Sequence, residues 1–430
     1  MANFDLGFGK GTLTVEIPDG QIAEVIEGKH VEPIADIRQA IKTAINDPVG
    51  SLPLAAVIQA GDKVCIIASD ITRAWLKHDK FLPVLLDELN ELGVPDSDIF
   101  LMVALGAHRY HTEAENIAVY GEETVRRIPI LQSCAMTTED FVYVGTTSRG
   151  VRCELNKHVV AADKVILTGG IVYHSMAGFG GGRKGVMPGV ASYNTIQGNH
   201  TFCLHEEIGK GISPTSASGK LEGNHMHEDQ MEMTAMLNPA FLLNIVLTPS
   251  GQFGRFVAGH WRDAWLSGCA TVAEIYGVPI AQQADLVIAT AGGFPKDINL
   301  YQGTKAQSNA VMACKADGVV ILLLECSDIN EPPDFMGWFD LKSLYDREIQ
   351  LRQGFTVPGF VALATGEEAA RIPHIVVTLP ENKAIIEKTG MHAVTTMEEA
   401  MALAEEKLGR KDYTVTVMPH ASNTVPIFRG

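Results

Sequence analysis

The chain has 430 residues, of which 46% are hydrophobic and 20% are charged. This length and composition predict about two to three folded domains and exclude a disordered chain. The formal net charge of −17 argues against a nucleic-acid-binding protein and against a protein drawn to an anionic membrane surface.

The first residues contain no stretch typical of a secretion signal, and no apolar run is long enough to span a membrane. The seven cysteines form no C-x-x-C pair and show no metal-ligand spacing, which is typical of reduced, buried thiols. We therefore expect a cytoplasmic protein that has neither nucleic acid nor a membrane among its partners.

Strands and helices alternate through the first half of the chain. The expected elements are, in order, a strand-turn-strand start within residues 1–20, a helix over 34–45, a buried strand over 62–68, a helix over 81–92, a buried strand over 99–105, a helix that begins at a capping box of Thr112 and Glu115 and stops at Gly121, and a strand over 164–168. This alternation is typical of a parallel sheet covered by helices.

Three of these strands end in polar or glycine-rich segments. Asp70 and Arg73 follow the first buried strand, His108 follows the second, and a glycine-rich loop starts at Gly169 after the third. Because ligands bind at the carboxyl ends of parallel strands, we expect these groups to lie at one edge of the sheet.

The glycine-rich loop is the most informative stretch of the chain. Seven glycines lie between Gly169 and Gly185, together with Lys184, and the histidines His174 and His200 lie in or just after the loop. Glycines let backbone N–H groups approach an anion, and a lysine can bind a phosphate or be modified at its amine. Imidazoles can hold a metal or move protons. A flexible surface loop with incidental histidines is the alternative.

Nucleotide-binding motifs fit this loop poorly. Gly180, Gly182 and Gly185 match G-x-G-x-x-G, but Pro188 interrupts the helix that must follow such a motif. The phosphate-loop pattern fails as well, because Gly185 stands where a serine or threonine must follow the lysine.

The second half of the chain repeats the alternation after a polar, irregular segment over 201–240. A His225-x-His227 pair in that segment suits zinc if it lies on a strand, but a solvated loop is the expected setting. The elements expected after it are a strand over 241–247, a helix over 260–276, a strand over 285–290, a helix up to about residue 316, a strand over 318–324, a helix from the capping box of Thr396 and Glu399 to Gly409, and a strand over 413–418.

The sequence therefore predicts an α/β fold with two domains, each with a mostly parallel sheet flanked by helices. We place the boundary near residue 277, with an N-terminal cofactor-binding catalytic domain over 1–277 and a C-terminal α/β domain over 278–430. The active site is expected in the cleft between the two domains.

Five short motifs in and after the glycine-rich loop together resemble the nickel-dependent lactate racemase family. They are Tyr173-His174, Ala177-Gly178-Phe179, Gly181-Gly182-Arg183-Lys184, Pro188-Gly189 and Asn199-His200, and the likeness covers nearly the whole chain. The resemblance implies a racemase or epimerase that inverts C2 of a 2-hydroxy acid by hydride transfer. The implied cofactor is a nickel-pincer nucleotide, a pyridinium mononucleotide with two sulfur-bearing arms that bind nickel, attached covalently at Lys184.

The resemblance also implies roles for individual residues. His108 and His174 correspond to the two acid/base histidines, and His200 corresponds to the remaining nickel ligand. It places the cofactor near Asp70, Thr72, Gly178, Gly181 and Gly182, and the substrate near Arg73, Tyr301, Gln302 and Lys305. The implied partners are a small-molecule 2-hydroxy acid and the enzymes that make the cofactor.

Two cationic residues suit their implied roles. Arg73 can grip a carboxylate by a two-point contact that lysine cannot copy, and Lys305 would strengthen an anion site at the start of a helix. Met176 and Gly180, however, stand where the family often has an aromatic residue and a serine. Because Met176 follows His174 by two residues, we expect it to line the substrate pocket, which leaves the substrate open between lactate and a larger 2-hydroxy acid.

Two other function classes remain open at this stage. An NAD-dependent 2-hydroxy acid dehydrogenase would bind free dinucleotide at Gly180–Gly185 and give net oxidation. A non-catalytic nickel- or nucleotide-binding protein would bind its ligand without inverting any 2-hydroxy acid.

Overall fold

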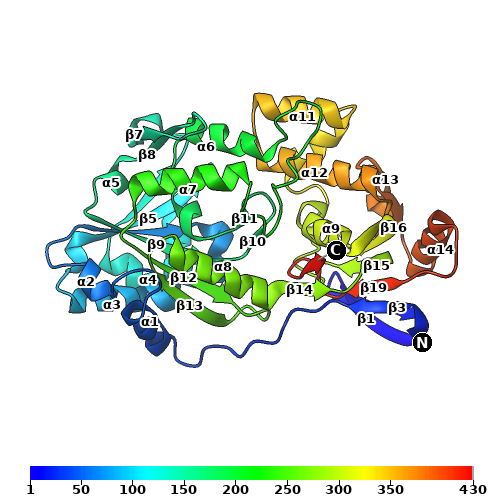
Figure 1. The fold of residues 1–430 in the computed structure, drawn as a ribbon, viewed down its shortest axis with the longest axis horizontal. Helices are drawn as coiled ribbons and strands as arrows, with labels where there is room; N and C mark the ends of the chain where they lie inside the picture. The colour runs from blue at the N-terminus through cyan, green and yellow to red at the C-terminus, as the bar shows by residue number, and fades with distance from the viewer. Residues whose placement is uncertain (429–430) are drawn as a thin grey trace. The chain divides into compact units, whose positions relative to one another are not determined.

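The computed structural model describes residues 1–428, which form two compact units (Figure 1). Unit 1 contains Met1–Lys29, Leu204–Ile212 and the residues from Glu274 on, and unit 2 contains His30–Cys203 and Ser213–Ala273. This division differs from the expected one, 1–277 and 278–430, because two early segments join unit 1. Strand pairing brings in the first segment, and contacts with a helix bring in the second.

The sheet of unit 1 is built from six parallel strands. They are β3 (Ile22–Val25), β15 (Ala284–Thr290), β16 (Cys314–Leu323), β17 (His374–Val377), β18 (His392–Val394) and β19 (Val415–Met418). Their order in the sheet is β18-β17-β16-β15-β19-β3, and β3 pairs in parallel with β19. This pairing is what places the N-terminal residues in unit 1, and it joins segments that sequence periodicity cannot connect.

A hairpin of β1 (Ala2–Phe8) and β2 (Gly11–Ile17) confirms the expected strand-turn-strand start. Its alternate side chains Leu6, Val15 and Ile17 are buried in the core of the same sheet. A two-stranded pair of β14 (Gly277–Ile280) and β20 (Val425–Phe428) completes the strands of this unit.

The helices of unit 1 are α9 (Leu300–Ala313), α10 (Pro333–Met336), α11 (Leu344–Gln353), α12 (Val357–Arg371), α13 (Lys383–Glu387) and α14 (Met397–Leu408). The predicted cap of α14 is confirmed, since the Thr396 side chain accepts a hydrogen bond from the N–H of Glu399. Gly409 ends the helix in the left-handed conformation, as expected for a glycine after the last turn.

Helix α11 holds the second early segment, Leu204–Ile212, in unit 1. The buried carboxylate of Glu348 accepts hydrogen bonds from the N–H groups of Gly209 (3.0 Å) and Gly211 (2.9 Å). Arg352 donates to the carbonyl of His205 at 2.5 Å and forms an ion pair with Glu348.

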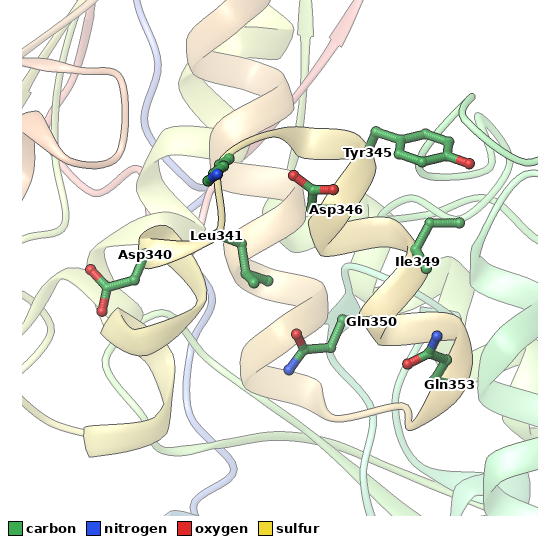
Figure 2. Close-up of a pocket in the computed structure, with 8 residues that line it drawn as sticks. Asp340, Leu341, Tyr345, Asp346, Ile349, Gln350 and Gln353 are labelled. Carbon is green, nitrogen blue, oxygen red and sulfur yellow. The ribbon is translucent and has the colours of Figure 1, made fainter.

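A surface hollow also lies along α11, and Tyr345 is among the side chains that line it (Figure 2).

The sheet of unit 2 is mixed. Its strands are β4 (Val64–Ser69), β5 (Ile99–Gly106), β6 (Ile130–Cys134), β9 (Lys164–Gly170), β12 (Phe241–Leu247) and β13 (Phe253–Gly259). Their order is β13-β12-β9-β4-β5-β6, with only β12 and β13 antiparallel. A separate hairpin consists of β7 (Phe141–Thr146) and β8 (Arg152–Asn156). The strands predicted over 62–68, 99–105, 164–168 and 241–247 are therefore confirmed, whereas β6 and β13, at the two edges of the sheet, were not predicted.

The helices of unit 2 are α1 (Ile37–Asn46), α2 (Leu54–Val57), α3 (His78–Glu91), α4 (Glu113–Arg127), α5 (Lys157–Val160), α6 (Tyr193–His200), α7 (His225–Leu237) and α8 (Asp263–Tyr276). The capping box of Thr112 and Glu115 is present at the start of α4. The predicted stop at Gly121 is confirmed as an interruption of α4, because Gly121 has a non-helical backbone with φ 83° and ψ 151°. A second helical stretch follows it and runs to Arg127.

The two faces of the unit 2 sheet pack against different partners. Val64, Ile66 and Ala68 of β4 belong to a core that also contains side chains of α1, α3 and α4. The alternate residue Ile67 points to the other face, where the backbone at Gly185 lies in van der Waals reach. The glycine-rich loop therefore sits directly on the sheet.

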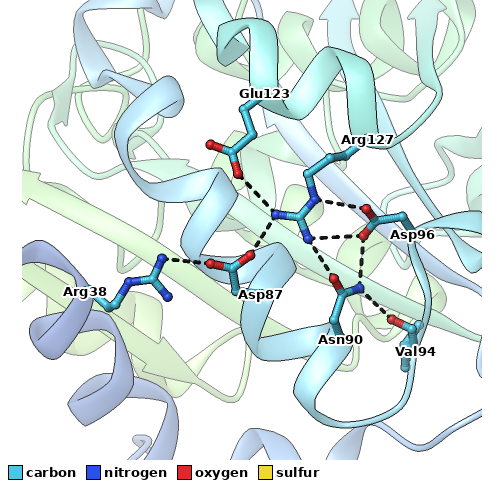
Figure 3. Close-up of polar contacts among 7 residues, drawn as sticks. All are labelled: Arg38, Asp87, Asn90, Val94, Asp96, Glu123 and Arg127. Carbon is cyan, nitrogen blue, oxygen red and sulfur yellow. Dashed lines mark hydrogen bonds and ion pairs between the residues drawn. The ribbon is translucent and has the colours of Figure 1, made fainter.

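A hydrogen-bonded network around Arg127 joins helices α1, α3 and α4, which pack on the same face of the unit 2 sheet (Figure 3). The Arg127 guanidinium donates to Asp87 (2.8 Å), to Asp96 (2.9 Å) and to Asn90 (2.7 Å). Asp87 also accepts from Arg38 of α1 at 2.7 Å. One cation thus connects α4 with α3 and, through a shared carboxylate, with α1.

Within residues 1–428, none of the helices is both long and apolar enough to cross a bilayer.

Candidate active site

Asp70 and His108 meet at the carboxyl ends of the neighbouring strands β4 and β5. The His108 Nδ1 forms a short hydrogen bond with Asp70 Oδ2, while the Thr72 hydroxyl donates to Asp70 Oδ1 at 2.6 Å. Burial alone would raise the pKa of Asp70, but the hydrogen bonds from His108 and Thr72 outweigh it and lower the pKa below its ordinary value. Because a carboxylate only accepts, Nδ1 of His108 carries the proton and the neutral ring presents a lone pair on Nε2.

Asp70 and Thr72 bond to each other, and Asp70 orients His108. The predicted contact of these two residues with a cofactor stays a prediction. The exposed Arg73 lies at a kink in the same short turn and donates to the carbonyl (3.2 Å) and hydroxyl (3.0 Å) of Thr72. Its positive charge is one of those that lower the pKa values of His174 and Lys184.

The glycines of the loop pack against the protein itself. A Cβ at Gly178 would lie 2.3 Å from the carbonyl of Lys220, and one at Gly182 would lie 2.5 Å from Trp265. At Gly181 it would lie 2.7 Å from a neighbouring carbonyl oxygen, and all three glycines have positive φ. The N–H of Gly182 donates to Asn244 Oδ1 at 2.8 Å. Close packing thus favours glycine at these three positions, and their predicted contacts with a cofactor stay a prediction. In the described chain a short 3-10 turn, Gly182–Gly185, stands where a dinucleotide fingerprint requires a longer helix.

Arg183 is the anchor that sequence reasoning missed. Its side chain is fully buried, donates to the carbonyls of Ala177 (2.7 Å) and Phe179 (3.1 Å), and stacks on the Trp265 ring at 4.1 Å. Burial lowers the pKa of Arg183 to about 9. The only signal in the sequence was its place beside Lys184, because Trp265 comes from the distant helix α8.

Lys184 and His174 are in direct contact. Lys184 Nζ lies 2.7 Å from His174 Nε2, and His174 Nδ1 accepts hydrogen bonds from the N–H groups of Met176 (3.2 Å) and Ala177 (3.3 Å). Burial lowers the pKa values of both groups well below their ordinary values, and the positive charges of Arg183 and Arg73 add to the effect. Met176 itself is buried, with 3% of its surface exposed.

His200 ends helix α6 and is 4% exposed. Its Nδ1 bonds to the carbonyl of Ile196 at 3.0 Å, which makes Nε2 the nitrogen with the lone pair. Burial lowers the pKa of His200 to about 3, and the charge of Lys184 contributes. A neutral imidazole is the form that binds a metal. Residues 1–428 contain no group of three or more His, Cys, Asp or Glu side chains that could hold a metal ion by themselves.

The prediction of a solvated loop around His225 and His227 was wrong. These residues begin helix α7, and the buried His227 ring packs on Trp265 with centroids 5.5 Å apart. Burial lowers the pKa of His227 to about 3. His227 therefore packs on the same Trp265 ring that stacks with Arg183 of the glycine-rich loop.

The predicted substrate residues of unit 1 lie in the first turns of α9. Asn299 caps this helix by accepting from the N–H of Gln302 at 2.9 Å, and Lys305 Nζ donates to Gln302 Oε1 at 2.6 Å. The Tyr301 ring packs edge-on against Phe335 at 5.3 Å. The cap and the lysine make this an anion-favouring helix start, and a substrate role for these residues stays a prediction.

Comparisons with known proteins cover the whole chain. A model described as the lactate racemase N-terminal domain matches residues 8–211, and one described as the lactate racemase C-terminal domain matches residues 280–425. The lactate racemase of Thermoanaerobacterium thermosaccharolyticum is 31% identical over 432 residues, which is 99% of each chain. That of Lactiplantibacillus plantarum is 31% identical over 433 residues, covering 97% of this chain and 98% of the relative.

Solved structures of other proteins are also similar to this chain. The apoprotein of the Thermoanaerobacterium thermosaccharolyticum lactate racemase superposes with a TM-score of 0.88, at 31% identity and over 100% of both chains. A Thermotoga maritima protein shares the fold with a TM-score of 0.59 at 15% identity, over 91% of this chain and 97% of the other.

Proposed function

The chain belongs to the lactate racemase family, and we propose that it inverts the configuration of a 2-hydroxy acid at C2 with the help of a nickel cofactor tethered to Lys184. As a racemase it is an isomerase, and the family is nickel-dependent. Lactate is the first substrate to test because both curated relatives are named lactate racemases.

The observation that carries this proposal is the pair of histidines, which are held in opposite forms. The carboxylate of Asp70 leaves His108 with a lone pair on Nε2, the form of a general base. The backbone N–H groups on Nδ1 of His174 leave that ring with its proton on Nε2, beside Lys184. Inversion at C2 requires the hydroxyl group to lose its proton to a base and to regain it once the hydrogen of C2 is back on the opposite face of the carbon.

The chain's own residues supply the proton transfers and the binding. His108 Nε2 takes the hydroxyl proton, and the Asp70 carboxylate stabilises the resulting imidazolium. Arg73, which is exposed in the same turn as Asp70, would bind the substrate carboxylate through its guanidinium. The imidazolium then returns its proton to the oxygen, so that no net change of charge or oxidation state remains.

The donor set fits a nickel-pincer nucleotide. Lys184 offers an amine with a strongly lowered pKa, and His200 offers a neutral, buried imidazole as one ligand. Nickel(II) suits an imidazole combined with soft sulfur ligands in a planar arrangement. When bound, such a cofactor supplies the hydride acceptor that C2 chemistry needs, because removing the C2 hydrogen as a proton beside a carboxylate would create an unstable dianion.

The decisive experiment uses protein co-produced with cofactor-making enzymes. We expect about one nickel per chain and a nucleotide-sized mass on the peptide that contains Lys184. A panel of 2-hydroxy acids should show inversion without uptake of deuterium from heavy water. An active preparation that lacks both the nickel and the added mass would refute the proposal, and net consumption of NAD would favour the dehydrogenase instead.

A further inference from the structure

The chain holds a buried amide that connects helix α7 to the catalytic loop. We propose that Asn224 is a positioning residue which, through a single peptide group, fixes His174 in the tautomer that keeps Lys184 an uncharged amine before the cofactor is attached. The inference rests on the proposed function, in that it takes Lys184 as the attachment site. It assigns the preparation of this amine to the chain itself.

Asn224 is fully buried and uses both ends of its side chain. Its Oδ1 caps α7 by accepting from the N–H of His227 at 3.1 Å. Its Nδ2 donates to the carbonyl of Met176 at 2.8 Å and to the carbonyl of Lys220 at 3.1 Å. The cap fixes the amide's orientation, so the donor end must point at the loop that carries His174.

The peptide group between Met176 and Ala177 transmits this orientation. A trans peptide is planar, and its C=O and N–H point in opposite directions. Asn224 holds the Met176 carbonyl on one side, and the Ala177 N–H therefore points to the other side, where it meets His174 Nδ1 at 3.3 Å. Arg183 holds the next carbonyl, that of Ala177, at 2.7 Å, so the following peptide cannot rotate freely either.

The hydrogen bonds on His174 determine its tautomer. Nδ1 receives two N–H groups, from Met176 and Ala177, and must therefore carry a lone pair. The proton of the neutral ring is then on Nε2, which lies 2.7 Å from Lys184 Nζ. An ammonium group has no lone pair and would direct its own proton at the Nε2 proton. Only an uncharged amine at Lys184 can accept this hydrogen bond.

The groups around Lys184 agree with an uncharged amine. Arg183 and Arg73 are cations that disfavour a further positive charge, and His200 is neutral at ordinary pH. In the described part of the chain, Lys184 forms no ion pair with a carboxylate.

The arrangement also gives an order to events. A neutral amine is the nucleophilic form of lysine, which covalent attachment through Nζ requires. Attachment by acyl transfer would form a bond from Nζ to the acyl carbon, break the bond from that carbon to its leaving group and release one proton from Nζ. The Nζ lone pair would then be delocalised into an amide and would no longer accept a hydrogen bond. His174 Nε2 then loses its partner and becomes available to the substrate. The same ring would thus serve Lys184 first and the hydroxy acid afterwards.

The test is the Asn224→Asp substitution in cofactor-free protein. Aspartate keeps the size of the side chain and the oxygen that caps α7, but it removes both N–H donors. The matched control is Asn156→Asp, because Asn156 is also a buried cap in unit 2, accepting from the N–H of His158 at 3.0 Å. Its side-chain amide donates to Ser133 at 3.3 Å instead of to the loop that carries His174.

The readout is the rate at which acetic anhydride labels Lys184 as a function of pH, followed by mass spectrometry of the Lys184 peptide. Nζ attacks the carbonyl carbon, the bond to acetate breaks, and Nζ releases one proton. We expect the unmodified protein and the control to label readily at neutral pH. In Asn224→Asp, labelling at neutral pH should fall about tenfold or more, with its midpoint moving toward the ordinary lysine value of about 10.4.

An unchanged labelling profile in a folded Asn224→Asp protein would overturn the inference. A second measurement needs no substitution: the ¹⁵N shifts of His174 in cofactor-free protein should show the proton on Nε2, and a proton on Nδ1 would equally overturn it. Both results are independent of nickel content and of racemase activity, so they fail separately from the proposed function.

Discussion

The Asp70→Asn substitution tests the catalytic pair most directly. The structure allows the new amide two orientations. If its nitrogen faces His108, the ring must accept on Nδ1, carry its proton on Nε2 and lose the base. If its oxygen faces His108, the tautomer survives, but the imidazolium formed during turnover has lost its neighbouring negative charge.

Either orientation removes most of the general-base contribution. That contribution is about 10²–10⁴ in rate, which corresponds to about 3–5 kcal/mol in the activation barrier. We therefore expect kcat of the loaded enzyme to fall by about 10²–10⁴ with nickel content unchanged. Asp79→Asn is the matched control, because Asp79 carries the same charge nearby, pairs with Lys80 and has no bond to His108.

The assay follows inversion from each enantiomer separately. Two enantiomers have equal free energy, so kcat/KM must fall by the same factor in both directions, which provides an internal check on the data. A folded Asp70→Asn enzyme whose kcat stays within about threefold of the parent would refute the reasoning that Asp70 orients and stabilises His108.

Three further predictions concern stability. Gly182→Ala should lower the free energy of unfolding by about 2–4 kcal/mol in urea titrations, because its Cβ would lie 2.5 Å from Trp265 at a φ of +51°; an unchanged midpoint would contradict the packing role. Arg127→Met should cost about 1–3 kcal/mol, less at high salt, by breaking the network of three helices, as thermal melts at two salt concentrations can check. His78 is fully buried, and burial lowers its pKa to about 4. The free energy of unfolding should therefore be highest above the unfolded pKa of about 6.5 and should fall by up to about 3 kcal/mol as the pH drops toward 4. His78→Phe should flatten this part of the curve of unfolding free energy against pH.

The parts of the fold that the sequence predicted are those with local signals. Buried strands show as short apolar runs, and capping boxes fix helix starts, as at Thr112 and Thr396. Helix α7 was missed because it buries polar side chains, among them His227, Asp229 and Gln230, so it lacks the apolar stripe that marks a helix. The pairing of β3 with β19 was missed because the sequence of a strand does not indicate which distant strand it will pair with.

The candidate site divides along the same line. The strand-end rule placed Asp70 and His108 together without any knowledge of their hydrogen bond. The supporting residues Asn224 and Trp265 could not be predicted, since each reaches the loop from a helix far along the chain. Sequence patterns reveal how a residue stabilises its own helix or strand. Asn224 and Trp265 instead contact a loop from another part of the chain, and only the folded structure shows these contacts.

The opposite hydrogen bonding of the two histidines also predicts how the enzyme treats its two substrates. A carboxylate stabilises His108 as a cation, whereas a cationic His174 would have to break two bonds from backbone N–H groups. The two directions of inversion thus begin from unequal ground states, although their kcat/KM values must agree. We expect one enantiomer to have both a lower kcat and a lower KM than the other, with kcat and KM differing by the same factor. Full progress curves from each pure enantiomer can measure this difference. Equal kcat and equal KM in both directions would show that the two rings become equivalent once the cofactor is attached.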